Sequence, residues 1–320
     1  MSGENPQKIY TNPIVLERAD PWVYKHSDGY YYFTGSVPGY KSVELRRARS
    51  LNDLENGERI TVWKAPETGP MSCLIWAPEI HFVRGKWYIY FAASDNEEIR
   101  NENHHHRMFV IENAEEDPMN TNWVEKGQIK TQFESFSLDG TMFEHQARLY
   151  YVWAQQDPVI PGNSNLYISE MENPWTLKGK QTLLSVPEYP WEKIGFSVNE
   201  GAAAIIRNGK VFITYSGSAT DENYAMGLLW ADEKSDLLNG FSWNKTVEPV
   251  FKSSPENQQF GPGHNSFTVS EDGKRDVIVY HARPEPNKVG DPLNNPNRHA
   301  RAQIFEWDEK GFPVFGEPVR

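Results

Sequence analysis

One pattern recurs five times along this 320-residue chain, at intervals of about sixty residues. Each copy is a run of aromatic or β-branched residues that ends in small or polar residues. The copies are "GYYYFTGS" from Gly29, "GKWYIYFAAS" from Gly85, "ARLYYVWAQ" from Ala147, "GKVFITYSGS" from Gly209 and "RDVIVYHAR" from Arg275. Four of them follow the turn signals "SDG", "VRG", "RNG" and "EDG". Each copy is therefore predicted to be the second strand of a β-hairpin.

The segments around these copies also match one another. The first strands of the predicted hairpins are "ADPWVYKH", "WAPEIHFV", "LDGTMFEH", "EGAAAIIR" and "HNSFTVSE". The third strands are "VELRRARS", "MFVIENAE", "NLYISEME", "MGLLWADE" and "AQIFEWDE", and a short extended piece follows most of them. Radial repeats of four antiparallel strands form a β-propeller. The sequence thus predicts an all-β, five-bladed β-propeller with four antiparallel strands per blade.

The period separates this propeller from the WD40 type, whose repeats run about 40–45 residues. No Pro-, Ser- or Gly-rich linker divides the chain, so residues 1–320 are expected to form a single catalytic domain. The sequence holds 11 tryptophans, 15 tyrosines and 16 phenylalanines. Such a content of flat rings suits both wide strand faces and sugar binding.

Charge and composition limit the partners. The net charge is −12 and no basic patch is found, which argues against nucleic acid and anionic membrane surfaces and favours a neutral substrate. No apolar run is long enough to span a membrane, and one cysteine excludes an internal disulfide framework. The N-terminus "MSGENPQKIYTNPIV" has no signal-peptide pattern, so a cytoplasmic location is expected, whereas the oligomeric state is left open.

Polar residues open the predicted inner strands. They are Asp20, Glu79, Asp139, Glu200 and His264, with 59 to 64 residues between successive positions. Inner strands of a propeller run in the same direction along the central axis, so these side chains are expected to converge at one end of the tunnel. Clustered carboxylates raise one another's pKa, and such clusters occur mainly at functional sites.

Most glycoside hydrolases use a pair of carboxyl groups, of which one acts as an acid and the other as a base or nucleophile. Glu200 precedes the apolar run "GAAAII", which is expected to raise its pKa by desolvation. Asp20 is followed by Pro21, whose ring stiffens the chain where the acid must be held. A carbohydrate-cleaving enzyme is the function that this pattern favours.

At these residues the chain resembles glycoside hydrolase family 43, five-bladed propellers that cleave arabinose- and xylose-containing glycans. The matching segments are "RADPWV", "IWAPEIHF", "SLDGTMF", "NEGAAAI" and "GPGHNSF", which together cover all five blades. The resemblance implies an inverting mechanism with Asp20 as general base, Glu200 as general acid, and Asp139 as the acid that orients Glu200 and raises its pKa. It also implies that Glu79 is structural.

Three further assignments follow from the resemblance. Trp76 matches an aromatic residue that lines the sugar pocket, although an inter-blade core position is its alternative. Arg301 matches an arginine that binds sugar hydroxyls, with Arg298 three residues away as the competing choice. His264 matches a histidine that in several members helps to hold a calcium ion or a water cluster in the tunnel. No cofactor is required for the chemistry, and a structural calcium ion is the one metal expected.

Within the family, "YYYFTGSVPGYKSVELRRARSLNDL" and "HHHRMFVIENAEEDP" look closest to exo-acting α-L-arabinofuranosidases. The function predicted is release of terminal α-L-arabinofuranosyl units from arabinan or arabinoxylan oligosaccharides. The alternatives are a β-D-xylosidase or an endo-arabinanase on the same scaffold, a retaining enzyme of a sister family, and a non-catalytic carbohydrate-binding propeller. The chain ends soon after its fifth blade without a sandwich domain, which is expected to favour an arabinosidase over a xylosidase.

Three other segments carry weaker signals. "HHH" within "NENHHHRM" is predicted to be a loop or strand entrance, because successive side chains on an extended segment point to opposite faces. Cys73 is expected to be a small buried filler, since nothing basic lies next to it in the sequence. "DPLNNPNRHAR" is expected to be a loop of the fifth blade that would influence substrate choice if it reached the tunnel mouth.

Overall fold

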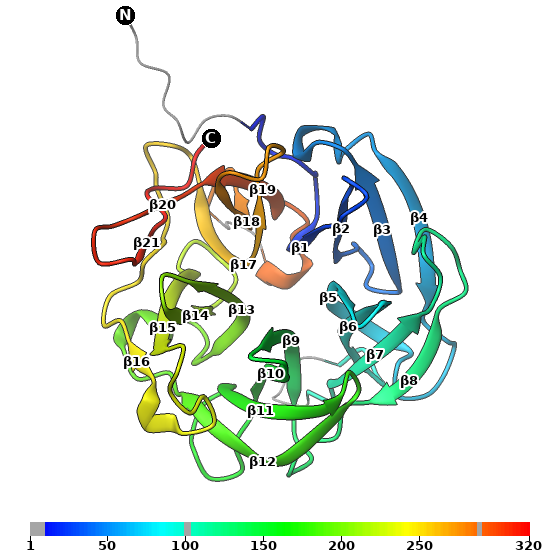
Figure 1. The fold of residues 1–320 in the computed structure, drawn as a ribbon, viewed down its shortest axis with the longest axis horizontal. Helices are drawn as coiled ribbons and strands as arrows, with labels where there is room; N and C mark the ends of the chain where they lie inside the picture. The colour runs from blue at the N-terminus through cyan, green and yellow to red at the C-terminus, as the bar shows by residue number, and fades with distance from the viewer. Residues whose placement is uncertain (1–9, 99–103, 287–289) are drawn as a thin grey trace, which may run out of the picture.

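The computed structural model describes residues 10–98, 104–286 and 290–320. Its antiparallel sheets stand around a central axis, and each sheet runs from an inner strand outward in chain order (Figure 1). The five-bladed β-propeller predicted from the repeats is confirmed. Blades one and two consist of β1 (Ala19–Lys25), β2 (Tyr31–Ser36), β3 (Ser42–Ala48), β4 (Glu58–Lys64), β5 (Cys73–Val83), β6 (Lys86–Ser94), β7 (Arg107–Asn113) and β8 (Val124–Gln128).

The remaining elements continue this order. Blades three and four consist of β9 (Ser137–His145), β10 (Arg148–Gln155), β11 (Asn165–Asn173), β12 (Thr176–Ser185), β13 (Asn199–Arg207), β14 (Lys210–Gly217), β15 (Ala225–Asp232) and β16 (Asn244–Lys245). Blade five has β17 (Phe260–Val269), β18 (Asp276–Arg283) and β19 (His299–Ile304), and the short pair β20 (Glu306–Trp307) and β21 (Pro313–Val314) follows it. Single 3₁₀ turns lie between strands, namely η1 (Leu51–Asp53), η2 (Pro190–Glu192), η3 (Gly240–Ser242) and η4 (Pro292–Asn294).

The fifth blade is completed from the other end of the chain. Its third strand, β19, begins three residues earlier than the predicted segment "AQIFEWDE". The outer edge of β19 pairs with the N-terminal segment, where the Ile14 amide donates to the Ala300 carbonyl at 2.9 Å and the Ala300 amide donates to the Val15 carbonyl at 2.9 Å. The N-terminal segment therefore fills the fourth strand position and closes the ring.

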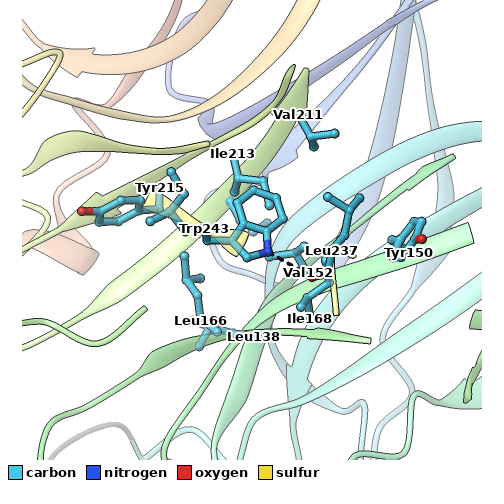
Figure 2. Close-up of a cluster of buried hydrophobic side chains, with 14 of the residues drawn as sticks. Leu138, Tyr150, Val152, Leu166, Ile168, Val211, Ile213, Tyr215, Leu237 and Trp243 are labelled. Atoms are coloured by element: carbon cyan, nitrogen blue, oxygen red, sulfur yellow. Dashed lines mark hydrogen bonds between the residues drawn. The ribbon is translucent and has the colours of Figure 1, made fainter. Parts of the chain in front are cut away.

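Hydrophobic side chains pack between the blades, and the buried core falls into five clusters. In the cluster of Figure 2, side chains of the third blade such as Val152 and Ile168 face Val211 and Ile213 of the fourth. Trp243 lies among them and its indole nitrogen donates to the Leu237 carbonyl at 3.0 Å. Burial of these faces, at about 25 cal/mol per Å² of apolar surface, holds neighbouring blades together and keeps their inner strands in place.

Each inner strand is interrupted by a β-bulge near its beginning, where the pairing with the second strand shifts. The residue at the bulge has a left-handed backbone in every blade. These residues are Asp20 (φ 55°), Ala77 (φ 46°), Asp139 (φ 53°), Gly201 (φ 60°) and His264 (φ 46°). Such a conformation is uncommon for residues other than glycine, and bulges are often used to redirect side chains beside active sites.

This repeat corrects the alignment of inner strands that the sequence predicted. The structural counterparts of Asp20 and Asp139 are Ala77 in the second blade and Gly201 in the fourth, not Glu79 and Glu200. Two of the five predicted polar residues, Glu79 and Glu200, therefore do not occupy the bulge position that equal spacing indicated. The reason is that a bulge inserts one extra residue into a strand, so sequence distance no longer measures position along the axis.

Candidate active site

A cavity lies near the beginnings of the inner strands. Its wall includes Asp20, Trp76, Asp139, Glu200 and His264, which are five of the six residues predicted for the site. The three acids come from three different blades, so the fold brings together side chains that lie up to 180 residues apart in the sequence. The fourth predicted acid position is not part of this wall.

Asp20 is held as a carboxylate by the groups around it. Its Oδ2 accepts a hydrogen bond from the Ser36 hydroxyl at 2.6 Å, and its Oδ1 lies 3.2 Å from His264 Nδ1 and 3.3 Å from an Arg298 nitrogen. Burial alone would raise the pKa of Asp20, but His264, Arg298 and His281 together outweigh it and lower that pKa far below its usual range. Asp20 is therefore ionised near neutral pH.

Glu200 has the opposite character. Burial is the main cause that raises its pKa to about 7, with a further contribution from the charge of Asp20, while a hydrogen bond from Tyr224 lowers it. The pKa of Asp139 is also raised well above its usual range, first by burial and then by the charges of Glu200 and Asp20. Asp139 Oδ2 accepts the Gly201 amide at 3.0 Å, one residue from Glu200. The cavity thus combines one carboxyl group whose pKa is lowered with two neighbouring carboxyl groups whose pKa values are raised.

Aromatic rings form another part of the wall. Trp76 stacks on His106, with ring centroids 3.8 Å apart, and meets the edge of Tyr40 at 6.2 Å. His104 and Phe136 also line the cavity, with ring centroids 4.7 Å apart. The three histidines of "HHH" directly precede β7, as predicted for a strand entrance, while Asn101–Asn103 lie outside the described residues. One histidine of this run, His104, lines the cavity, and His106 contacts the lining residue Trp76.

The arginine of the pocket is Arg298 and not Arg301. Arg298 precedes β19, is 4% exposed and contacts Asp20 and the Tyr40 hydroxyl. Arg301 lies within β19, pairs with Tyr280 and is not among the lining residues of the cavity. Arg301 therefore does not line this cavity, and its predicted contact with the substrate stays a prediction.

Glu79 lies two residues beyond the bulge of the second blade. It is 2% exposed, and its Oε2 is 3.0 Å from His81 Nε2. Burial raises the pKa of Glu79 well above its usual range and lowers the pKa of His81 to about 3, so burial disfavours the charged form of both side chains. Glu79 is absent from the wall of the cavity that the three acids line.

The environment of His264 does not match a calcium site. Its Nδ1 faces Asp20 and lies 3.9 Å from Asp139 Oδ2. Calcium takes six to eight oxygen ligands, and over residues 10–98, 104–286 and 290–320 no group of three or more His, Cys, Asp or Glu side chains is arranged to hold a metal ion. The predicted calcium ion is not confirmed, and we assign no metal ligand here.

The structure corrects the prediction for Cys73 and shows where the segment "DPLNNPNRHAR" lies. Cys73 is partly exposed and not a buried filler, and Lys41 lies 3.5 Å from its sulfur and 2.7 Å from Glu97. The basic neighbour Lys41 precedes β3 and lies 32 residues away in the sequence, so the residues next to Cys73 could not reveal it. The loop "DPLNNPNRHAR" does reach the cavity, which Leu293 lines.

Acids of opposed ionisation in an aromatic cavity at one end of a propeller define a carbohydrate-cleaving enzyme, a glycoside hydrolase. Residues 10–313 match the profile of Glycosyl hydrolases family 43. The chain belongs to this family, as its motifs predicted. In the described part of the chain no helix has the length and apolar character needed to cross a membrane.

The chain is similar to several characterised proteins. It is 49% identical to an extracellular exo-α-(1→5)-L-arabinofuranosidase of Streptomyces avermitilis over 98% of this chain and 65% of the relative. It is 48% identical to a protein of the same name from Streptomyces chartreusis, over 88% of this chain and 85% of the relative. A crystal structure of an α-L-arabinofuranosidase from Lactobacillus brevis is 56% identical, covers 97% of both chains and has a TM-score of 0.95.

The chain thus spans about two thirds of the length of the first of these relatives. Two of the relatives are named as extracellular proteins. The comparisons therefore give no support to the cytoplasmic location that the N-terminal sequence predicted.

Proposed function

We propose that this protein is an inverting exo-acting α-L-arabinofuranosidase in which residues 1–320 work as one catalytic propeller domain. The observation that carries the proposal is the pair of opposed carboxyl groups in one cavity, an ionised Asp20 and a Glu200 whose pKa is raised to about 7. The arabinofuranosidases to which the chain is similar support the choice of sugar. The names of two of them also favour a location outside the cell.

In this mechanism the two groups act on opposite sides of the bond to be cleaved. Glu200 gives its proton to the glycosidic oxygen, which leaves with the electron pair of the carbon–oxygen bond. Asp20 accepts a proton from a water molecule whose oxygen forms the new bond to the anomeric carbon. One proton is released and one is taken up, so a turnover ends with Asp20 protonated and Glu200 ionised, and solvent restores both.

Exo action is supported by a partition beside the cavity. Tyr40, Leu293 and Arg298 line both this cavity and a neighbouring one. The Tyr40 hydroxyl donates to the Leu293 carbonyl at 2.7 Å, and Arg298 donates to the Tyr40 hydroxyl at 3.4 Å. The contact joins a loop of the first blade to a loop of the fifth. A glycan chain running from one cavity toward the other would meet this partition, which favours binding of the terminal sugar of a neutral oligosaccharide.

A product panel tests the proposal. The protein is incubated with linear arabino-oligosaccharides, arabinoxylan and xylobiose, and the released sugars are separated while NMR follows the anomeric configuration of the first product. Arabinose of inverted configuration is expected as the sole early product. Asp20→Asn and Glu200→Gln are expected to lose activity on arabinobiose by about 10²–10⁴-fold, whereas Glu112→Gln, on the outer strand β7, serves as a folded control.

The other outcomes separate the alternatives. Xylose as the product would indicate a β-D-xylosidase, and internal oligosaccharides would indicate an endo-arabinanase. A first product of retained configuration would contradict the role of Asp20 as a base. Release of no sugar from any substrate would contradict the enzymatic proposal and favour a carbohydrate-binding propeller.

A further inference from the structure

Tyr224 contacts the acid from outside the predicted catalytic set. It directly precedes β15 and is 1% exposed. Its hydroxyl oxygen lies 2.9 Å from Glu200 Oε1. A buried phenol keeps its hydrogen bonded to an acceptor, and burial raises the pKa of Tyr224 well above its usual range, so the group is a neutral donor. Oε1 of Glu200 therefore accepts this hydrogen.

Two residues of the fifth blade hold the Tyr224 ring in place. His281 stacks on the ring, with centroids 5.5 Å apart and planes inclined by 12°. On another side a Cβ at Gly263 would lie 2.6 Å from Tyr224 Cε1, so only glycine leaves room for the ring. His281 also accepts the Asp20 amide at 3.1 Å. The stacked pair of Tyr224 and His281 thus contacts both the carboxyl group of Glu200 and the backbone of Asp20.

We propose that Tyr224 is a positioning residue for the general acid, holding Glu200 Oε1 so that the transferable proton is carried by Oε2. This inference rests on the proposed function, because it requires Glu200 to be the acid. During the reaction the Oε2–H bond breaks, the proton binds the leaving oxygen, and that oxygen takes the electron pair of the glycosidic bond. The phenol remains bonded to Oε1 and stabilises the carboxylate that forms.

Several charged and titratable groups lie around the cavity of Glu200 or contact the groups that act on its pKa. From the strands and loops that meet at the cavity they are Asp20, Asp139, His264, His281, Arg298 and Tyr224. Burial and Asp20 raise the pKa of Glu200, whereas Tyr224 and Arg298 lower it. Loss of the phenol hydroxyl is therefore expected to raise the pKa of Glu200. Activity that depends on the protonated acid would then persist to higher pH.

The test is Tyr224→Phe, assayed on arabinobiose and on a nitrophenyl arabinofuranoside whose leaving group needs no proton. On arabinobiose, the pH at which kcat/KM falls on the basic side is expected to rise by about one unit, since the lost hydrogen bond stabilised the charged form of Glu200. The maximal kcat/KM is expected to drop about tenfold, within the range of acid catalysis. On the nitrophenyl substrate kcat/KM is expected to change less than about twofold.

Tyr215→Phe is the matched control. Tyr215 is also fully buried, and its hydroxyl lies 2.9 Å from Oε1 of a buried glutamate, Glu192, which is not part of the cavity wall. Its loss is expected to lower thermal stability without moving the pH profile. An equal shift with Tyr215→Phe, an unmoved profile with Tyr224→Phe, or equal losses on the two substrates would overturn the proposal.

Two further measurements keep the result unambiguous. If Tyr224→Phe does not fold, a fluorinated tyrosine at position 224 replaces it. This side chain is a stronger hydrogen-bond donor, so the basic limb is expected to move to lower pH, and an unmoved or upward limb would overturn the proposal.

Glu200→Gln separates this inference from the proposed function. A loss on arabinobiose alone would support Glu200 as the acid whatever Tyr224 does, whereas unchanged activity of Glu200→Gln would contradict the proposed function itself.

Discussion

At the scale of single residues, identical chemical groups acquire opposite properties from their neighbours. Asp20 and Glu200 are both carboxylic acids in one cavity, and both are raised in pKa by burial. Asp20 also faces Arg298, His264 and a serine hydroxyl, and these favour its charged form. The hydrogen bond from Tyr224 and the charge of Arg298 lower the pKa of Glu200, but they do not offset the rise that burial causes. The division between acid and base is therefore set by the neighbours and not by the type of side chain.

Asp139→Asn tests this electrostatic balance. The charge of Glu200 raises the pKa of Asp139, and because that repulsion acts on both groups, an ionised Asp139 also raises the pKa of Glu200. An amide removes the repulsion, so the basic limb of kcat/KM on arabinobiose is expected to start about one pH unit lower. Asp276→Asn, on β18 and outside the cavity wall, controls for the loss of one negative charge. An unmoved limb would mean that Asp139 stays protonated throughout the working range.

At the scale of elements, the bulges of the inner strands are joined from blade to blade. The amide of the bulge residue donates to a side chain of the preceding blade in four cases. The pairs are Asp20 to His281 at 3.1 Å, Ala77 to Ser36 at 2.9 Å, Gly201 to Asp139 at 3.0 Å and His264 to Ser216 at 2.9 Å. A bulge leaves an amide outside the strand ladder, and these acceptors satisfy it. The left-handed backbone that aims the acids is thus held by neighbouring blades.

Gly140→Ala tests how tightly the bulge of the third blade is fixed. Gly140 follows Asp139, and a Cβ there would lie 1.9 Å from the hydroxyl oxygen of Tyr151, which is fully buried on β10. Overpacking of this kind is expected to cost about 1–3 kcal/mol of the free energy of unfolding and to displace Asp139, so activity should fall as well. Thermal or urea unfolding measures the first effect and kcat/KM the second.

A second substitution checks the cause. Tyr151→Ala removes the ring that a side chain at position 140 would meet, so the destabilisations of Gly140→Ala and Tyr151→Ala are expected to be less than additive in the double variant. Full additivity would show that Tyr151 is not the group that requires glycine at this position.

At the scale of the whole molecule, the ring is closed by residues from opposite ends of the chain. Besides the pairing of residues 14 and 15 with Ala300, the Asn12 side chain bonds both backbone groups of Ala302, accepting its amide at 2.8 Å and donating to its carbonyl at 3.0 Å. This closure lies beside β1, whose Asp20 is the predicted base (Figure 1). The first and fifth blades, which supply Asp20, His264 and Arg298, are therefore fixed relative to each other by this contact.

Asn12→Ala tests the closure. It removes two hydrogen bonds to a partly buried strand edge and is expected to lower the free energy of unfolding by about 1–3 kcal/mol. Thr11→Ala, an exposed neighbour, is the control. A melting temperature that falls equally in the two variants, or in neither, would show that the Asn12 contacts do not secure the ring.

The sequence by itself determined the propeller, because its signals are local. Alternation of side chains along a strand and turn residues between strands act over a few positions, so the second strands from "GYYYFTGS" to "RDVIVYHAR" were predicted where they lie. The order of motifs also predicted the family, and five of the six named site residues lie around one cavity. The predicted roles of those residues stay predictions until the variants are measured.

The tertiary structure decided the details that depend on contacts across blades. A bulge shifts every later side chain of its strand, so Glu79, two residues after the bulge, does not line the cavity, whereas Glu200, one residue before it, does. Arg298 precedes β19 and contacts Asp20 in the pocket, whereas Arg301 lies within β19 and does not line the pocket. Tyr224 reaches Glu200 across 24 residues of sequence. Positions of this kind follow from the packing of whole sheets against one another, which no short segment of sequence encodes.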